Sequence, residues 1–264
     1  MPNLILRSLK KSVVIVPVLL TTGLAAWAVK QKVWTKPQSA INKSAVTYAA
    51  PSYDPALLQK FREVVKSLDL KDKPYTCTGQ ISMMDKADTA GAIKGFNFVF
   101  SRNGNDCYYR LQDVEMLNAE HVYLVVDHAN KRVIVSAQKE IKMPVLGDGG
   151  KLAELLQSED YQLKDKVDGR NETLTALNEH HLSCKEYAVT YDTVSHKINR
   201  IYTRLSDITD VTNKDKDRII DLRISTLTEE AAVSSYLNVK KVLRQSGGQW
   251  KLQPAFSNYE LIKI

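Results

Sequence analysis

Histidines are the first side chains in this chain that suggest chemistry, because imidazoles held together can bind a metal ion. His180 and His181 are adjacent, and His121 and His128 lie seven residues apart. Adjacent residues on a strand point to opposite faces, so His180 and His181 would not easily share one ion. His128 and His196 fall in expected turns. We therefore predict surface or turn histidines and no metal site.

A run of aspartates is the second candidate, since carboxylates gathered in one loop can bind calcium. The run lacks the central glycine and the terminal glutamate of a calcium loop, and Lys214 and Lys216 lie within it. We therefore interpret it as a solvated loop before a strand. Its members are Asp207, Asp210, Asp215, Asp217 and Asp221.

The motifs of the common enzyme classes are missing from the sequence. It contains no G-x-S-x-G, no H-E-x-x-H and no phosphate-binding glycine loop. No motif in the sequence therefore indicates nucleophilic catalysis, metallohydrolase activity or nucleotide binding. We predict a non-enzymatic protein with no catalytic residue and no cofactor. An envelope hydrolase stays open, because the spacing of carboxylates in space cannot be read from a chain with 30 acidic residues.

The three cysteines are too few and too widely spaced for a disulfide scaffold, and no C-x-x-C pair suggests zinc or redox chemistry. Cys77 and Cys107 could form a disulfide if their strands are neighbours. The other interpretation is that both, with Cys184, are buried thiols that pack as small apolar side chains. The sequence leaves the two interpretations open.

Residues 12–29 form an uncharged apolar run that Arg7, Lys10 and Lys11 precede. Eighteen helical residues span roughly 27 Å, close to the thickness of a hydrocarbon core of about 30 Å. We predict a membrane segment with a cytoplasmic N-terminus, so that the rest of the chain is exported. Three lysines soon after the run keep the opposite topology open.

Two fates are open for residues 1–29. The triplet ending at Ala28 fits signal-peptidase cleavage, which would release a periplasmic protein. The length of the apolar run favours an uncleaved anchor, which would make the membrane a partner through residues 12–29 and hold the protein at the exported face of the inner membrane.

Charge argues against nucleic acid as a partner. The formal charge of +7 falls to +4 without residues 1–28, and the remaining basic residues are scattered among acids.

Residues 30–52 mix Lys, Ser, Ala and Pro and are predicted to be a tether. The region 53–264 is long enough for a single domain with a well-buried core.

The region 53–264 is predicted to contain few helices. Asp54 suits an N-cap and Pro55 the first helical position, and apolar residues then repeat at helical spacing to about Leu70. A second, shorter helix is predicted over 151–158.

In most of the remaining sequence, apolar and polar residues alternate with period two in segments that turn residues separate. This pattern is typical of antiparallel hairpins. A strand is expected over Tyr75–Met83, and the strand with Ile220, Leu222 and Ile224 should have one dry face and one wet face. About nine to eleven strands result, and so large a sheet must bend around something. The fold class is thus α+β, a curved antiparallel sheet or half-open barrel with one or two helices in its concave face. Four hairpins are predicted, with strands at 96–102 and 107–111, 122–126 and 132–135, 187–191 and 198–205, and 239–243 and 250–252.

A leading amphipathic helix, the strand Tyr75–Met83 and paired strands such as VYLVVDHANKRVIVS resemble the LolA-like and LolB-like outer-membrane lipoprotein carriers of bacterial envelopes. The resemblance covers roughly residues 54–264 and rests on architecture. It implies a half-open barrel whose apolar cavity holds acyl chains.

The leading hypothesis is a bacterial envelope protein that binds a lipid-like ligand, such as a lipid or lipoprotein acyl chain, on the concave face of the sheet. The alternative is a membrane-anchored interaction or scaffold subunit of an envelope assembly, with a filled core and an envelope protein as partner. The candidate cavity residues are Phe98, Phe100, Val122, Leu124, Val126, Val133, Val135, Ile220, Leu222 and Ile224.

Overall fold

A computed structural model of the chain describes residues 53–264 except 69, 71–72, 141–155 and 157. The predicted membrane segment, its cleavage site and the tether at 30–52 lie outside the described residues. So does most of the predicted helix at 151–158. Among the described residues no helix is both long and apolar enough to cross a membrane.

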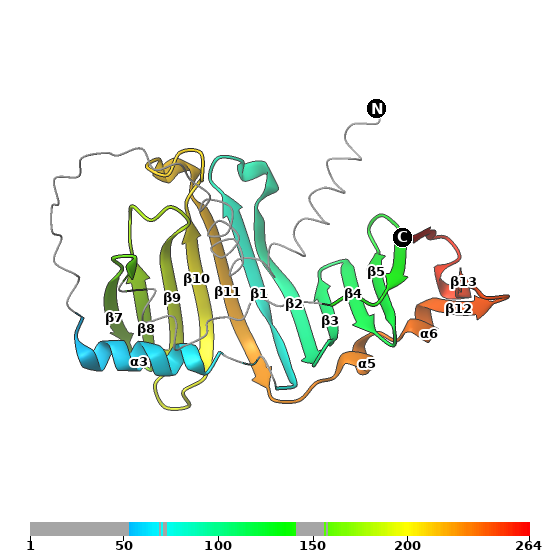
Figure 1. Cartoon of the computed structure of the whole chain (residues 1–264), viewed down its shortest axis with the longest axis horizontal. Helices are drawn as coiled ribbons and strands as arrows, with labels where there is room; N and C mark the ends of the chain where they lie inside the picture. The colour runs from blue at the N-terminus through cyan, green and yellow to red at the C-terminus, as the bar shows by residue number, and fades with distance from the viewer. Residues whose placement is uncertain (1–52, 69, 71–72, 141–155, 157) are drawn as a thin grey trace, which may run out of the picture. The chain divides into compact units, whose positions relative to one another are not determined.

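Twelve strands of the described region hydrogen-bond into one large sheet, and two more form a separate hairpin (Figure 1). The sheet is not closed into a barrel, since β14 and β7 stand at the two ends of the strand order. The large antiparallel sheet with few helices is confirmed, with one strand more than the predicted upper number. The order is β14 (Glu260–Lys263), β6 (Arg132–Ala137), β5 (Val122–Asp127), β4 (Val114–Ala119), β3 (Asp106–Leu111), β2 (Ile93–Asn103), β1 (Tyr75–Asp85), β11 (Arg218–Thr228), β10 (Ile198–Leu205), β9 (Cys184–Asp192), β8 (Asn171–Leu177) and β7 (Gln162–Asp168).

Contacts divide the described residues into two compact units, with those of 53–68, 83–92 and 156–221 in unit 1 and those of 70–82, 93–140 and 222–264 in unit 2. Unit 1 contains the helix α3 (Pro55–Lys66), which contacts β7. The helix begins as predicted, because the Asp54 carboxylate accepts a 2.9 Å hydrogen bond from the Ala56 N–H. It ends before Leu70, because Ser67 caps it and its hydroxyl donates to the Val64 carbonyl at 2.6 Å.

Replacing Asp54 with Ala is expected to lower the free energy of unfolding by about 1 kcal/mol, the usual cost of losing an N-cap acceptor. Asp54→Asn is the matched control, since its side-chain oxygen can still accept from the Ala56 N–H. Urea unfolding of the two variants checks this. Equal stability of both variants would show that the cap contributes nothing.

Polar interactions also hold unit 1 together. The Lys60 ammonium on α3 lies 2.6 Å from the Glu172 carboxylate on β8. One aspartate of the predicted solvated run is in fact buried: the Asp217 side chain is 0% exposed and lies 2.6 Å from the equally buried Lys185 ammonium. The prediction of a solvated loop is therefore wrong at Asp217, because a strand-borne lysine neutralises this carboxylate inside the core.

Unit 2 is an antiparallel meander from β2 to β6, covered on one face by the C-terminal segment 231–259, which we call the covering segment. This segment contains α5 (Val233–Tyr236), α6 (Val239–Val242) and the hairpin of β12 (Leu243–Ser246) and β13 (Gln249–Leu252). The predicted strand at 239–243 is thus mostly helix. The reason is local: the Asn238 side chain caps α6, and Val239 and Val242 are buried at helical spacing.

The last strand departs from the expected hairpin pattern, since β14 pairs with β6 in parallel. A parallel neighbour needs a long connection, and the strands β7 to β13 all lie between β6 and β14 in the chain, with the covering segment 231–259 as the last part. The chain therefore returns to the edge of the meander after covering one of its faces.

Candidate functional site

The register of unit 2 assigns each strand residue to one of two faces, because directly opposed residues point the same way and neighbours along a strand alternate. Phe100 opposes Tyr109, which opposes Met116. Tyr108 opposes Leu117 on the other side. We call these the Tyr109 face and the Tyr108 face.

The predicted cavity residues of unit 2 do not surround one cavity, since they divide between these faces. Phe98 and Phe100 lie on the Tyr109 face. The five valine and leucine candidates of β5 and β6 lie on the Tyr108 face. The members of this second set are Val122, Leu124, Val126, Val133 and Val135.

The Tyr109 face carries an aromatic cluster. The Phe100 ring centroid lies 5.5 Å from that of Tyr75 and 6.4 Å from that of Tyr109. Burial raises the pKa of the Tyr109 phenol above its usual range. Within the described residues its hydroxyl is buried without a hydrogen-bond partner.

The Tyr108 face is mostly filled by the protein itself. Leu124, Val126 and Val133 are 0% exposed and pack against the C-terminal segment, so they form core. The buried cluster on this face comprises Tyr108, Leu117, Ala119, Val122, Leu124, Val126, Val133, Val135, Val233, Leu237, Val239, Val242 and Leu243.

The three candidates on β11 lie apart from this cluster. Ile220 is buried in unit 1, whereas Leu222 and Ile224 are half-buried in unit 2. None of the three lines the pocket described next. A role in ligand binding for these residues stays a prediction.

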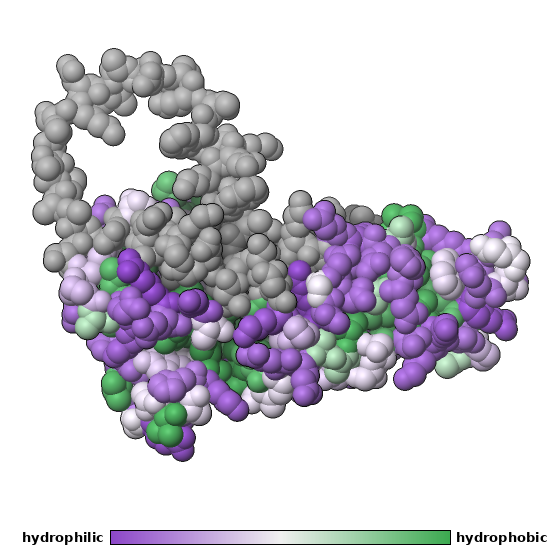
Figure 2. Space-filling model, turned by 60° about the horizontal axis from the view of Figure 1, so that its bottom comes forward, coloured by the Kyte–Doolittle hydropathy of each residue, from purple (hydrophilic) through white to green (hydrophobic). Residues whose placement is uncertain are grey.

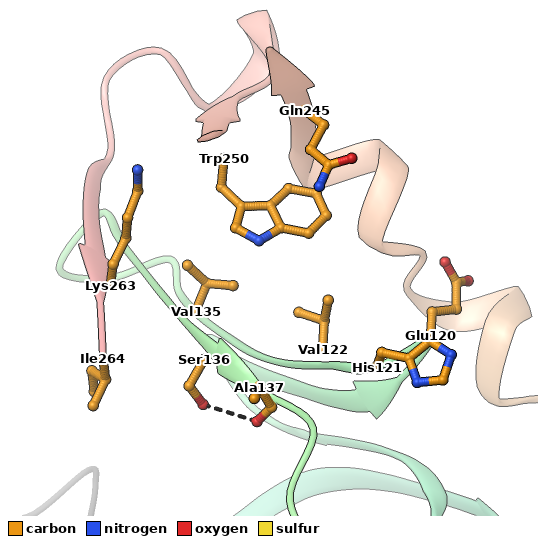
Figure 3. A pocket seen from close by; sticks show the side chains of 10 residues that line it. All are labelled: Glu120, His121, Val122, Val135, Ser136, Ala137, Gln245, Trp250, Lys263 and Ile264. Carbon is orange, nitrogen blue, oxygen red and sulfur yellow. Dashed lines mark hydrogen bonds between the residues drawn. The ribbon is translucent and has the colours of Figure 1, made fainter. Parts of the chain in front are cut away.

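A pocket of about 570 Å³ opens at the end of the Tyr108 face, between β5, β6, β14 and the β12–β13 hairpin (Figure 3). Two predicted cavity residues, Val122 and Val135, form its floor, and the Trp250 indole lies over them. The residues that line it are Glu120, His121, Val122, Val135, Ser136, Ala137, Gln245, Trp250, Lys263 and Ile264.

Charged or polar groups stand at opposite sides of the pocket, with Lys263 on one side and Glu120 and His121 on the other (Figure 3). Glu120 and His121 form the two-residue turn between β4 and β5, and both have positive φ, 54° and 65°. Such a turn normally uses Asn or Gly, because other side chains are strained there. The strained turn carries these two polar side chains to the rim.

A chain of hydrogen bonds links the end of the covering segment to the sheet. Tyr259 Oη lies 3.0 Å from His128 Nδ1, and His128 Nε2 lies 2.9 Å from Glu115 Oε1. The Tyr108 hydroxyl donates to Glu115 Oε2 at 2.7 Å. Burial, with this hydrogen bond, raises the pKa of Tyr108 above its usual range. The turn histidine His128 thus joins the covering segment to the sheet.

The other predicted reactive residues lie outside the pocket. Cys77 and Cys107 are free thiols, because β2 lies between their strands β1 and β3. Burial raises the pKa of both thiols to about 12. His181 bonds to Glu159 at 2.9 Å, and its neighbour His180 is exposed.

The sequence matches no protein-family model and no curated protein. Among solved structures, an uncharacterized conserved protein from Thermus thermophilus is 7% identical at a TM-score of 0.38, over 78% of this chain and 98% of that chain. A LolA superfamily protein from Nitrosomonas europaea is 11% identical at a TM-score of 0.28, over 65% and 92%. The Pseudomonas aeruginosa MucA/MucB complex gives 11% and 0.32, over 74% and 63%. A LolA superfamily protein is therefore among the structures that this chain is similar to, as the sequence resemblance predicted.

Proposed function

We propose that this chain is a non-enzymatic bacterial envelope protein that binds the acyl chain of a lipid-like ligand in the pocket at the end of the Tyr108 face. The observation that supports this proposal is a pocket of about 570 Å³, with Val122, Val135 and Trp250 as apolar walls and charged residues at its rim. Small-molecule sites usually have this size and this combination of apolar walls with a few polar groups.

The energetics favour an apolar chain over a small polar ligand. Each methylene buried against these walls contributes about 0.8 kcal/mol. The ligand's polar end would remain at the rim, where Lys263 offers a cation to a carboxylate or phosphate. The exported location proposed for residues 53–264 would give the pocket access to envelope lipids.

The test is photolabelling of the full-length chain with a diazirine-bearing palmitate, followed by peptide mapping. We expect label on the peptides that contain residues 120–122, 135–137 and 245–250. Ala137→Trp should lower this label at least tenfold, because an indole in the pocket excludes several methylenes, and two of them already account for about 1.6 kcal/mol.

Ala255→Trp is the matched control, since Ala255 is an exposed alanine of unit 2 outside the pocket. Unchanged labelling in this variant would show that a new surface tryptophan alone has no effect. Equal labelling of the Ala137→Trp variant, or label spread evenly over the chain, would contradict the pocket as the binding site.

A scaffold subunit is the second candidate function, and the filled Tyr108 face favours it. Two exposed apolar side chains, Leu182 and Ile208, lie on neighbouring loops of unit 1, which the Ser206 N–H joins by bonding to the Ser183 carbonyl at 3.0 Å. The strand β7 is a poor docking edge, because its exposed Lys and Asp side chains disfavour added strands. An unlabelled pocket together with an envelope protein crosslinked to these loops would support this candidate instead.

A further inference from the structure

The covering segment of unit 2 has an unusual charge. Residues 231–259 contain four basic residues and not one acidic residue, whereas the whole chain has 37 basic and 30 acidic residues. The segment thus supplies more than half of the formal charge of +7. The four are Lys240, Lys241, Arg244 and Lys251.

The fold places all four cations on the outer side of the segment. On α6, Val239 and Val242 are buried, and the two lysines between them are exposed. In the adjoining hairpin Leu243 opposes Leu252, and both pack on the core. Arg244 and Lys251 oppose each other on the alternate side and are exposed. Figure 2 shows hydrophilic side chains over the right-hand end, where Figure 1 places α6 and the hairpin.

The acidic residues that flank the segment do not neutralise this surface. Along the chain they are Glu230 before it and Glu260 after it, and the Glu260 carboxylate already pairs with Arg132 at 3.1 Å. Glu120 lies across the pocket, at the rim opposite Lys263. The outer side of the segment is therefore positively charged, and its inner side packs on the core of unit 2.

We infer that the outer side of α6 and the β12–β13 hairpin docks on a bilayer surface rich in anionic phospholipid. Four basic residues beside one another, with apolar residues holding the opposite side to the core, have the pattern of a lipid-surface contact. Each Lys or Arg near an anionic surface strengthens the contact about fivefold, so four together give roughly 700-fold. This docking does not require a ligand in the pocket.

Lysine footprinting tests the inference. The full-length chain is reconstituted in vesicles of phosphatidylcholine alone or of phosphatidylcholine with phosphatidylglycerol, and labelled with a membrane-impermeant amine reagent. Labelling of Lys240, Lys241 and Lys251 should fall at least tenfold in the anionic vesicles. It should recover in 1 M salt, where the screening length shrinks to about 3 Å. Lys164 and Lys166, exposed on β7, serve as internal references and should change little.

A pair of arginine variants separates docking from general charge. Arg244→Gln should weaken the lysine protection about fivefold, whereas Arg62→Gln, which removes an exposed arginine of α3, should leave it unchanged. Equal labelling in the two kinds of vesicle overturns the inference. Protection by soluble poly-glutamate but not by anionic vesicles also overturns it and would assign the surface to an acidic protein partner.

Discussion

Asp217→Ala is expected to lower the free energy of unfolding by about 3–5 kcal/mol, the range for removing one partner of a buried ion pair. The Lys185 ammonium would remain in the core of unit 1 without the carboxylate that now lies 2.6 Å away. Both side chains are fully buried, so water cannot replace the lost partner.

A third residue determines how the partner variants differ. Arg204 Nη1 lies 3.2 Å from the second oxygen of Asp217, and the same guanidinium bonds to Glu179 at 2.7 Å and to Glu186 at 3.2 Å. Lys185→Met therefore leaves Asp217 with one cation, and the loss of stability should be smaller than in Asp217→Ala. The Arg204 guanidinium would keep two carboxylates in Asp217→Ala and all three in Lys185→Met.

Urea unfolding of both single variants and of Lys185→Met/Asp217→Ala measures the pair. The double variant should recover most of the stability lost in Asp217→Ala, because an apolar pair has no desolvation cost. If the double variant lost as much free energy of unfolding as the two single variants together, the coupling between Lys185 and Asp217 would be contradicted.

Local signals in the sequence were enough to place the first helix. Asp54 caps α3 and Pro55 opens it, as the residue types require. The end was misplaced because the apolar repeat continues to Leu68, which is buried just beyond the helix. The spacing of apolar residues indicates which side chains are buried, and a side chain can be buried beyond the last helical residue.

Most of the hairpins were predictable, the exception being the one that begins at 239, but the faces of the sheet were not. The turn at 103–106 and the strands around it were expected, and the structure has β2 and β3 there. Each strand has two alternating sets of residues, and only one of them packs against the covering segment. The register across several strands decides which set this is, because a shift of one residue would exchange the faces. The candidate list therefore mixed Phe98 and Phe100 with residues of the opposite face.

Most of the pocket could not be read from the sequence. Val122 and Val135 were found by alternation. Trp250 and Lys263 reach the same pocket only because the chain crosses the Tyr108 face and returns beside β6 in parallel. The strained turn at Glu120 carries no turn-residue signal, since neither Asn nor Gly occupies it.

Gly79→Ala is expected to destabilise unit 2 by about 3 kcal/mol or more. A Cβ at this position of β1 would lie 2.0 Å from the Arg223 carbonyl oxygen and 2.9 Å from Cε1 of the Phe98 ring. The first contact is with backbone, so relief requires the neighbouring strand β11 to move. Overpacking usually costs about 1–3 kcal/mol, and a clash with backbone lies at or above the upper end.

Two further variants separate the clash from the loss of a glycine as such. Gly95→Ala meets no atom within 4 Å and should cost only about 1–2 kcal/mol, which reflects its left-handed φ of 63°. Phe98→Leu added to Gly79→Ala removes the ring contact but leaves the carbonyl in place, so it should not restore stability. Urea unfolding measures all three variants, and recovery in the double variant would show that the ring, not the backbone of β11, sets the requirement for glycine.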